Sequence, residues 1–187
     1  MFLTAEREMK SKPNTADITD KPTNMQQALF CIGLIAIVLG LSVLGFLGIR
    51  KLHREYQKQK LMRENPVVEI ADLRIKAPIL EGTDNDTLSK AAGHFIGTGE
   101  LGKGNYCIAG HSSTLYKEYF NNLKNIEIGM KITLYDIKKA SYEYTVKETF
   151  IVEPSETWIL NDFGDDRVTI ITCTDDGTQR LVVIGEK

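Results

Sequence analysis

Residues 22–49 contain no charged side chain, and this segment limits what the chain can fold into more than any other feature. Its apolar centre, residues 28–49, is long enough to cross a bilayer as a helix, which needs about 20 residues. A buried helix of a soluble protein is seldom this long, and a cleaved signal peptide has a shorter apolar core and a small-residue cleavage site. We therefore predict a retained transmembrane helix over residues 28–49, in which Cys31 is a small apolar residue.

The segments on either side of this helix are polar. Residues 1–27 are mixed in charge and lack periodicity, which predicts a disordered tail. Residues 50–64 are rich in charge and free of Gly and Pro, which predicts a polar stalk that continues the helix, with His53 beside the membrane. More Lys and Arg residues follow the helix than precede it, so the positive-inside rule alone would place the C-terminal side in the cytoplasm.

From residue 65 onward the pattern changes to short β-type runs separated by turn residues. The runs include VVEI, NYCIAGH, KITLYDI, SYEYTVKETFIV, RVTIITC and RLVVIGE, and the stretch TDNDTLSKAAG is typical of an N-cap and one short helix. Many short strands of this kind predict a mostly β domain over residues 65–187, a closed barrel with one or two short helices. About 120 residues are enough for one hydrophobic core.

Charge and cysteine content exclude several classes of protein. The formal net charge is -2, so no overall basic field points to nucleic acid. The cysteines are Cys31, Cys107 and Cys173, an odd and sparse set that matches neither a disulfide framework nor the ligand spacing of a zinc site. Only 3 histidines are available to a mechanism that needs an imidazole.

Cys173, His111 and Arg180 each lie where an apolar strand meets a loop. Cys173 is followed by the polar turn TDDG, so its thiol can face a cleft and act as a nucleophile. His111 follows the run NYCIAG and is a candidate general acid or base. Arg180 opens the next strand, and if the two strands pair antiparallel its guanidinium can stabilise a thiolate or an oxyanion. A buried structural thiol, a surface histidine and an exposed strand arginine are the alternatives.

Other residues of these types are weaker candidates. His94 lies in the Gly-flanked segment AAGHFIG and is a second candidate imidazole. Cys107 is about 13 Å along the strand from His111, and we interpret it as core, although a disulfide with Cys173 stays open. Arg167 opens the strand that ends at Cys173, which leaves it about 20 Å away from the thiol.

These motifs resemble those of the sortase family. TIITC (residues 169–173) matches the family's TLxTC signature with Ile in place of Leu, and AGH (residues 109–111) resembles the segment that ends in the family's catalytic histidine. Arg180 matches the family's arginine on the following strand. AAGHF resembles the segment of a second, non-essential histidine, and FNNLKNIEIGMKI resembles the segment after the catalytic one. The resemblance covers about residues 67–186, and these motifs together with an N-terminal anchor are highly specific.

The resemblance implies a fold and an activity. Sortases are eight-stranded β-barrel transpeptidases on the outer face of Gram-positive membranes, and they cut an LPxTG-type sorting signal between Thr and Gly. Their cysteine forms a thioacyl intermediate, which an amine of a cell-wall precursor or a pilin lysine resolves. By this resemblance Cys173 is the nucleophile, His111 the general acid/base and Arg180 the residue that stabilises the oxyanion or the substrate backbone. Thr172 would lie beside the substrate, and His94 would be accessory.

The loop before the cysteine strand occupies the position of the family's substrate-recognition loop. Its residues Trp158, Ile159 and Leu160 either pack against Leu-Pro of a sorting signal or belong to the core. No cofactor is expected unless the chain binds calcium, which some class A sortases use. The candidate calcium ligands are Glu100, Glu153, Glu156 and Asp162, which are acidic residues in loops.

The resemblance also implies a class, a location and partners. A short domain behind an N-terminal anchor is similar to class A, the housekeeping class, and class D is compact too. No lid with a blocking aromatic residue is evident, which disfavours the pilin-polymerising class C. The family's location requires an extracellular catalytic domain and a cytoplasmic N-terminus, despite the flanking charges. The implied partners are surface proteins with a C-terminal LPxTG-like signal, a cell-wall precursor amine and membrane lipid, with no nucleic acid.

Two other functions stay open. A cysteine hydrolase of another fold, papain-like or a cell-wall amidase, commonly has its cysteine at the start of a helix and before the histidine, whereas Cys173 follows His111 and opens a loop between strands. A non-catalytic membrane-tethered β-domain that binds a surface ligand would carry an inert thiol. The combination of Cys173, His111 and Arg180 argues against that second alternative, and alkylation of Cys173 separates a reactive thiol from an inert one.

Overall fold

The computed structural model of the chain describes residues 24–112 and 119–187. It divides into two compact units, residues 1–50 and residues 51–187. The predicted disordered tail falls mostly on residues 1–23, which lie outside the described part of the chain.

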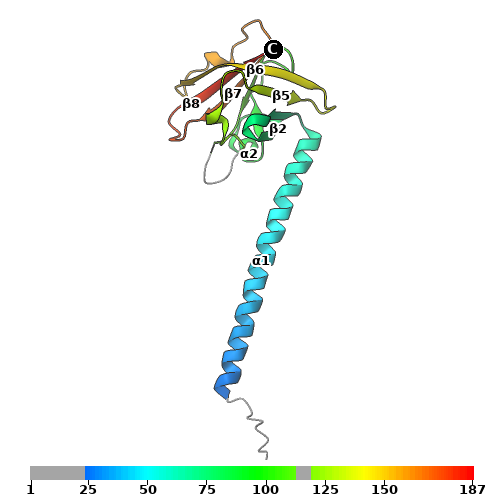
Figure 1. Ribbon diagram of the computed structural model, residues 1–187, viewed down its shortest axis with the longest axis vertical. Coiled ribbons are helices and arrows are strands. Elements are labelled where there is room, and N and C mark those ends of the chain that lie inside the picture. The colour runs from blue at the N-terminus through cyan, green and yellow to red at the C-terminus, as the bar shows by residue number, and fades with distance from the viewer. Residues whose placement is uncertain (1–23, 113–118) are drawn as a thin grey trace, which may run out of the picture. The chain divides into compact units, whose positions relative to one another are not determined.

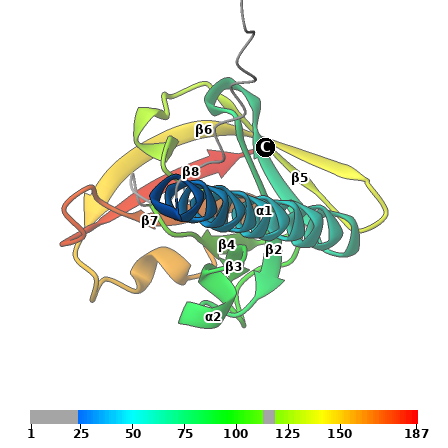
Figure 2. The ribbon, with the colours of Figure 1, turned by 90° about the horizontal axis from the view of Figure 1, so that it is seen from below.

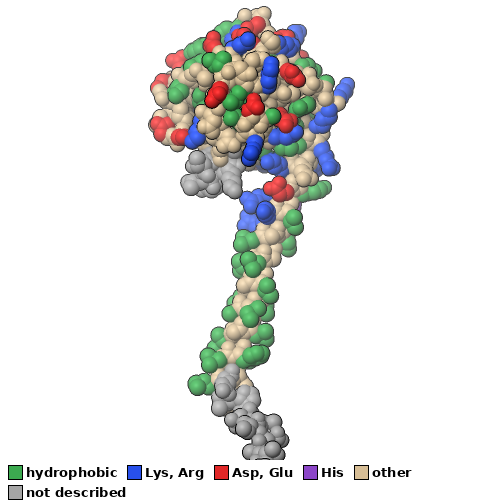
Figure 3. Space-filling view, viewed as in Figure 1, with side chains coloured by type: hydrophobic (Ala, Val, Ile, Leu, Met, Phe, Trp, Pro, Cys, Tyr) green, Lys and Arg blue, Asp and Glu red, His purple; other side chains and the backbone are tan. Residues whose placement is uncertain are grey.

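One continuous helix, α1 (Asn24–Glu64), contains both the predicted membrane span and the predicted stalk (Figure 1). It has 41 residues and no Pro, and it begins four residues before the span predicted over residues 28–49. The side chains of residues 29–50 are all exposed, and hydrophobic ones cover the visible face of this segment (Figure 3). The helix is long and apolar enough to cross a membrane. A helix with this much exposed apolar surface is suited to lipid rather than to water.

The domain that follows is a closed barrel of eight strands, as predicted (Figures 1 and 2). The strand order around the barrel is β1-β2-β3-β4-β7-β8-β6-β5, and β5 pairs with β1 to close it. The β2–β3 and β4–β7 pairs are parallel, and the other pairs are antiparallel. The strands are β1 (Val67–Ile70), β2 (Ile75–Glu81), β3 (Ala92–His94), β4 (Asn105–Ala109), β5 (Lys131–Tyr135), β6 (Ser141–Val152), β7 (Arg167–Cys173) and β8 (Arg180–Glu186).

Short helices in the described residues lie in the connections between the strands. The four-residue helix α2 (Asn85–Leu88) lies within the stretch TDNDTLSKAAG, where one short helix was predicted. Asp84 is its N-cap, because its carboxylate accepts hydrogen bonds from the backbone N–H groups of Asp86 and Thr87. Single turns of 3-10 helix occur at η1 (Ala71–Leu73), η2 (Leu123–Asn125) and η3 (Trp158–Leu160).

The hydrophobic core has two layers, one on each face of the β7–β8 hairpin. Successive side chains of a strand point to opposite faces of a sheet. Val168 and Ile170 of β7 therefore lie in the main cluster inside the barrel. The other face carries a second cluster, here called the outer cluster, whose buried members are Ile159, Ile171, Val182 and Ile184.

Candidate active site

The hairpin of β7 and β8 brings Cys173 and Arg180 together. The two strands pair antiparallel, and these two residues are register partners next to the turn. Side chains that are directly opposed on neighbouring strands share a face, with Cβ atoms about 5 Å apart. The antiparallel pairing that Arg180 needs in order to reach Cys173 is therefore present. The guanidinium also donates hydrogen bonds to the backbone carbonyls of Gln179 at 3.0 Å and Gly177 at 3.4 Å, which hold it beside the turn.

The turn between these strands is held by its own polar side chains. The carboxylate of Asp176 accepts hydrogen bonds from the hydroxyls of Thr174 at 2.5 Å and Thr178 at 2.7 Å. These hydrogen bonds, that from Thr174 above all, lower the pKa of Asp176 to about 2. Gly177 has a φ of 74°, in the left-handed region that favours glycine. The Thr174 N–H closes the turn on the carbonyl of Gln179 at 3.1 Å, so the turn fixes the register that pairs Arg180 with Cys173.

The parallel pairing of β4 with β7 brings His111 to the same end of the sheet. Ala109 is the register partner of Ile171, so continuing the register by two residues puts His111 level with Cys173. Neighbouring strands lie about 4.8 Å apart. Two hydrogen bonds extend the pairing beyond β4, from the Gly110 N–H to the Ile171 carbonyl at 3.1 Å and from the Thr172 hydroxyl to the Gly110 carbonyl at 2.8 Å.

Gly110 is required because an aromatic ring packs directly against its backbone. A Cβ at this position would lie 2.4 Å from the ring of Phe120, which is fully buried. The backbone N–H of Phe120 donates to the carbonyl of His111 at 3.3 Å. The backbone on both sides of the His111 side chain is thus held by the core, which explains the glycine in the AGH motif.

The cysteines differ in environment, and all three are free, so the disulfide between Cys107 and Cys173 that the sequence left open is not formed. Cys173 is half-buried at the end of β7. Cys107 is fully buried, and burial raises the pKa of its thiol to about 11. The Cys107 side chain is therefore a core residue, as the sequence indicated, and it is protonated at neutral pH.

A pocket of about 210 Å³ lies at this end of the sheet and is lined in part by Cys173, and we call it the Cys173 pocket. Thr172 lines this pocket, with its hydroxyl hydrogen-bonded to Gly110 as described. Residues from other parts of the domain also line it. They are Ser112 after β4, Lys124 of η2, Ile151 of β6, Thr174 and Asp175 of the turn, and Leu181 of β8.

Three residues predicted to contact substrate, Trp158, Ile159 and Leu160, form η3 in the loop between β6 and β7 (residues 153–166), here called the β6/β7 loop. They have three different environments. Ile159 is buried in the outer cluster, and Leu160 packs against it. Trp158 is 47% exposed and stacks on Phe150 of β6 with ring centroids 5.7 Å apart. Trp158 is thus the member of this set that presents most of its surface to solvent.

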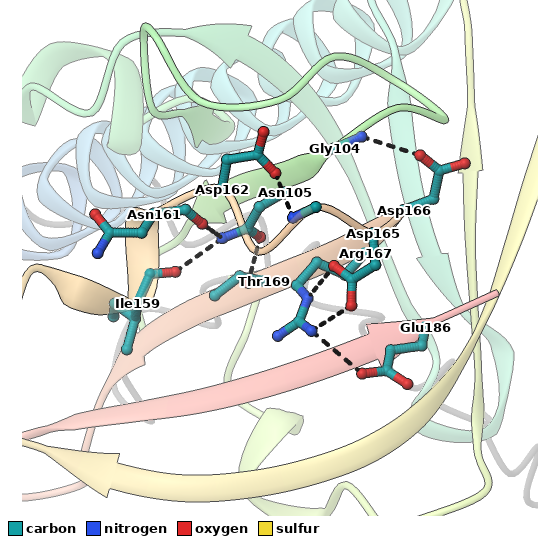
Figure 4. A network of polar contacts seen from close by, with 11 residues as sticks. Gly104, Asn105, Ile159, Asn161, Asp162, Asp165, Asp166, Arg167, Thr169 and Glu186 are labelled. Carbon is teal, nitrogen blue, oxygen red and sulfur yellow. Dashed lines mark hydrogen bonds and ion pairs between the residues drawn. The ribbon is translucent and has the colours of Figure 1, made fainter.

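Asn105 fastens this loop to the barrel (Figure 4). Its side chain is 1% exposed, and its amide NH₂ donates to the carbonyls of Ile159 at 2.9 Å and Asn161 at 2.8 Å. Its amide oxygen accepts from the hydroxyl of Thr169 at 2.6 Å. Sequence reasoning missed Asn105, and the available signal was a polar residue at the start of the apolar run NYCIA.

The far end of the β6/β7 loop is held by ion pairs (Figure 4). Asp165 pairs with Arg167, which lowers the pKa of that carboxyl. Asp166 accepts from the Gly104 N–H at 3.0 Å and from Lys187 at 2.6 Å. Arg167 is therefore a structural residue at the end of β7 remote from Cys173, in agreement with the sequence interpretation.

His94 is a buried residue of β3 with hydrogen bonds at both ring nitrogens. It is 7% exposed and stacks on Tyr106 with ring centroids 4.3 Å apart. Its Nδ1 lies 3.0 Å from the Glu81 carboxylate, and its Nε2 lies 3.0 Å from the Gly99 carbonyl and 3.1 Å from the Thr98 hydroxyl. Both nitrogens thus face acceptors, and the described residues that line the Cys173 pocket do not include His94.

This arrangement predicts that His94 supports folding. We expect His94→Ala to lower the free energy of unfolding by about 2 kcal/mol, because it removes a buried ring together with its stacking on Tyr106 and its hydrogen bonds. The measurement is chemical denaturation of the full-length chain in detergent micelles. His53→Ala is the control, since His53 is exposed on α1, and it should leave unfolding unchanged. Equal unfolding curves for the two variants would refute a structural role for His94.

The four candidate calcium ligands do not gather into a site. In the part of the chain that the structure describes, no group of three or more His, Cys, Asp or Glu side chains is arranged to hold a metal ion. Glu153 accepts a hydrogen bond from the Gln179 amide at 2.7 Å, and Asp162 accepts one from the Gly164 N–H within its own loop. Glu100 lies in the turn that pairs it with Lys103, and Glu156 is exposed. These residues therefore do not fit a calcium site in this arrangement.

Comparison with known proteins agrees with this geometry. The sortase domain family model matches residues 68–187, which is the barrel. Sortase A of Bacillus anthracis is 31% identical over 121 residues, which cover 64% of this chain and 57% of that relative. The match spans about half the length of the curated sortase A relatives.

Solved structures give the same result. Sortase C-1 from Actinomyces oris superposes with a TM-score of 0.60 at 31% identity, over 65% of this chain and 70% of that one. A Clostridium perfringens sortase D5 transpeptidase superposes with a TM-score of 0.59 at 30% identity, over 71% and 87% of the two chains. Because structures of different sortase classes match equally well, the barrel alone does not separate the classes. Its barrel, its motifs and the family match show that the chain belongs to the sortase family.

Proposed function

We propose that the chain is a membrane-anchored cysteine transpeptidase. It would cleave an LPxTG-like sorting signal of surface proteins between Thr and Gly and transfer the protein to a cell-wall amine. The observation that carries this proposal is the register of β4, β7 and β8: it pairs Arg180 with Cys173, and continued by two residues past β4 it would put His111 level with Cys173 on the other side. Membership of the sortase family supports it independently.

In the first half of the reaction, the signal peptide is cut and the enzyme is acylated. The Cys173 thiolate attacks the carbonyl carbon of the signal's Thr, and a C–S bond forms. Arg180 stabilises the negative charge that develops on the carbonyl oxygen through charge-assisted hydrogen bonds. The C–N bond to Gly then breaks, and His111 protonates the leaving amine. The product is a thioacyl intermediate on Cys173.

In the second half, an amine acceptor resolves the thioacyl intermediate. The neutral amine attacks the thioester carbonyl, a C–N bond forms and the C–S bond breaks. His111 takes the proton that the amine loses, and the thiolate returns to Cys173. Two simpler steps thus replace one difficult exchange of amides.

We assign the other predicted residues by their environments. Trp158 and the accessible edge of Leu160 would contact the apolar Leu-Pro of the signal, whereas Ile159 holds η3 in the outer cluster. Thr172 would act through its hydrogen bond to Gly110, which aligns His111. His94 would support the fold of β3 and its loop rather than contact substrate.

We propose a single-pass topology in which α1 is the membrane anchor. The N-terminus would be cytoplasmic and the barrel extracellular, where sorting signals and cell-wall amines are found. The length and apolarity of α1 support the anchor.

The test is to incubate the full-length chain in detergent micelles with a library of LPxTG-like peptides and primary amines, and to identify products by mass spectrometry. We expect cleavage between Thr and Gly together with an amide product of the added amine. Cleavage without amide formation would favour the cysteine hydrolase. No reaction with any peptide, and no difference from Cys173→Ala, would favour the non-catalytic binding domain.

The role of Arg180 is tested in the same assay. We expect Arg180→Ala to lower kcat/KM by about 10²–10³-fold, the usual effect of removing one group that stabilises an oxyanion. Arg63→Ala is a matched control, since Arg63 is exposed on α1, and should retain full activity. If Arg180→Ala retains activity as well, Arg180 has no part in the reaction.

A further inference from the structure

The part of α1 that follows the apolar segment carries an excess of positive charge. Residues 51–64 contain five Lys or Arg side chains and two Glu, whereas residues 65–187 contain 13 Lys or Arg and 19 Asp or Glu. Along the helix, Lys and Arg side chains follow the apolar ones (Figure 3). The proposed topology puts this segment on the outer side of the membrane, where the positive-inside rule does not favour Lys and Arg. That rule therefore does not account for these charges.

Three of these basic residues share one face of the helix. Lys51, Arg54 and Lys58 follow one another at intervals of three and four residues, and side chains with this spacing are neighbours on a helix surface. Like charges four residues apart, as in Arg54 and Lys58, destabilise a helix because they repel each other. An anion bound along this face would relieve that repulsion.

No carboxylate of the described residues is paired with this face. Glu55 lies four residues after Lys51 and three before Lys58, but the ion pairs of the described part of the chain all lie within residues 69–187. Lys51 and Arg54 are exposed, so an anion can reach them. Lys58 is half-buried, with its ammonium 4.8 Å from the centroid of the Tyr119 ring.

The end of this helix is attached to the barrel. The Lys139 ammonium donates to the carbonyl of Met62 at 3.0 Å, and the side-chain amide of Asn65 donates to the carbonyl of Leu61 at 3.0 Å. The last carbonyls of a helix have no partner within it, so these hydrogen bonds stabilise its C-terminus. Residues 51–64 therefore stay helical up to the barrel, and the basic face keeps its spacing.

The basic face follows the apolar segment closely. Lys51, Arg54 and Lys58 come two, five and nine residues after Ile49, the last apolar residue of the uncharged segment. A helix rises about 1.5 Å per residue, so all three lie within about 14 Å of the end of that segment. The headgroup region on each side of a bilayer is about 5–8 Å thick, and electrostatic attraction extends about 8 Å further at physiological salt. The three cations are thus within reach of headgroup phosphates.

We propose that Lys51, Arg54 and Lys58 form a binding surface for the headgroups of anionic phospholipids in the leaflet from which this segment emerges. The ligand class is a lipid phosphodiester with a net negative charge, such as phosphatidylglycerol. Basic side chains close to a bilayer attract anionic lipid, and the attraction falls off within a Debye length. This inference goes beyond the proposed reaction and rests on the proposed membrane anchor.

The test measures which lipid the chain prefers as its neighbour. The full-length chain is reconstituted in phosphatidylcholine vesicles that contain spin-labelled phosphatidylglycerol or spin-labelled phosphatidylcholine, and electron paramagnetic resonance gives the ratio of their association constants. We expect a preference for phosphatidylglycerol of about fivefold, which falls toward one in about 1 M KCl because salt screens the charges. We expect Lys51→Gln/Arg54→Gln to lower this preference to less than about twofold.

Lys60→Gln/Arg63→Gln is the matched control. It removes the same charge from the same helix, but 11 and 14 residues after Ile49, so it should keep the preference for phosphatidylglycerol. Glutamine is a good helix former, so both variants should keep the helix. If the two variants lower the preference equally, only net charge matters, and the proposal is overturned. It is also overturned if Lys51→Gln/Arg54→Gln keeps the full preference.

The remaining outcomes also decide. If the chain does not float with the vesicles in a density gradient, the proposed anchor fails, and the lipid-binding surface falls with it. If the chain floats but shows no preference for phosphatidylglycerol, the anchor stands and the lipid-binding surface is refuted. Crosslinking between copies in the same vesicles, lost in Lys51→Gln/Arg54→Gln while no lipid preference is seen, would assign this face to the acidic barrel of a second copy instead.

Discussion

Replacing Cys173 with alanine is expected to abolish peptide cleavage, with a loss of at least about 10⁴-fold in kcat/KM, because covalent catalysis loses its nucleophile. The measurement is the rate of release of the Gly-containing fragment by the full-length chain in detergent micelles. Folding should be nearly unaffected, since Cys173 is half-buried at a strand end. Cys107→Ala is the matched control and should retain activity, because Cys107 is buried away from the pocket lining.

The same two cysteines should differ in reactivity. In a Cys31→Ala background, a methanethiosulfonate reagent is expected to modify Cys173 and to leave Cys107 intact at pH 7–9. Burial shields the Cys107 thiol and raises its pKa to about 11, so little of the nucleophilic thiolate exists in that range. Modification of Cys107 before Cys173 in the native chain would contradict the assignment of Cys173 as the accessible thiol.

Replacing Asn105 with alanine is expected to release the β6/β7 loop and to lower the free energy of unfolding by about 2–4 kcal/mol, because three hydrogen bonds, two of them buried, are lost at once. The carbonyls of Ile159 and Asn161 and the hydroxyl of Thr169 would lose their partner. Hydrogen exchange should increase in residues 157–162. The factor by which KM for the signal peptide rises should be about ten times the factor by which kcat falls, because the loop would no longer be pre-organised to bind the peptide.

Two controls separate this positioning role from a general loss of stability. Asn161→Ala removes a side chain of the same kind in the same loop but keeps the backbone carbonyl that Asn105 binds, so it should leave peptide KM unchanged. Asn105→Asp keeps the shape and the acceptor for Thr169 but opposes two carbonyl oxygens with a carboxylate, so it should resemble Asn105→Ala. If Asn105→Ala unfolds the chain more easily yet binds peptide with unchanged KM, the loop does not depend on Asn105.

The fold class was predictable from the sequence because the necessary signals are local. An uncharged apolar run of bilayer length indicates one helix, and short β-branched runs between turn residues indicate strands of a barrel. The boundary between span and stalk was less predictable, because apolar and polar segments both continue one helix without a break. The backbone hydrogen bonds of a helix join residues four apart whatever their side chains are. The helix therefore continues unchanged where the side chains change from apolar to polar.

The candidate site was predictable only in part. Cys173, His111 and Arg180 were recognisable as residues at strand ends, and the family resemblance named them together. The individual environments of Trp158, Ile159 and Leu160 were not recognisable, because the three are adjacent in sequence and only packing separates an exposed ring from a buried side chain. Asn105 was missed, since its hydrogen-bond partners lie more than 50 residues away along the chain.

The sequence by itself determined which helices and strands form and which reactive side chains lie at their ends, because hydrophobic periodicity and turn chemistry act over a few residues. Only the tertiary structure decided which of those ends meet. The β4–β7 pairing joins segments about 60 residues apart, and it brings the end of β4, next to His111, to the end of β7 that carries Cys173. The hydrogen bond from Lys139 to Met62 likewise exists only in the folded chain. Strand register is set by which side chains can be buried together, and that is a property of the whole core.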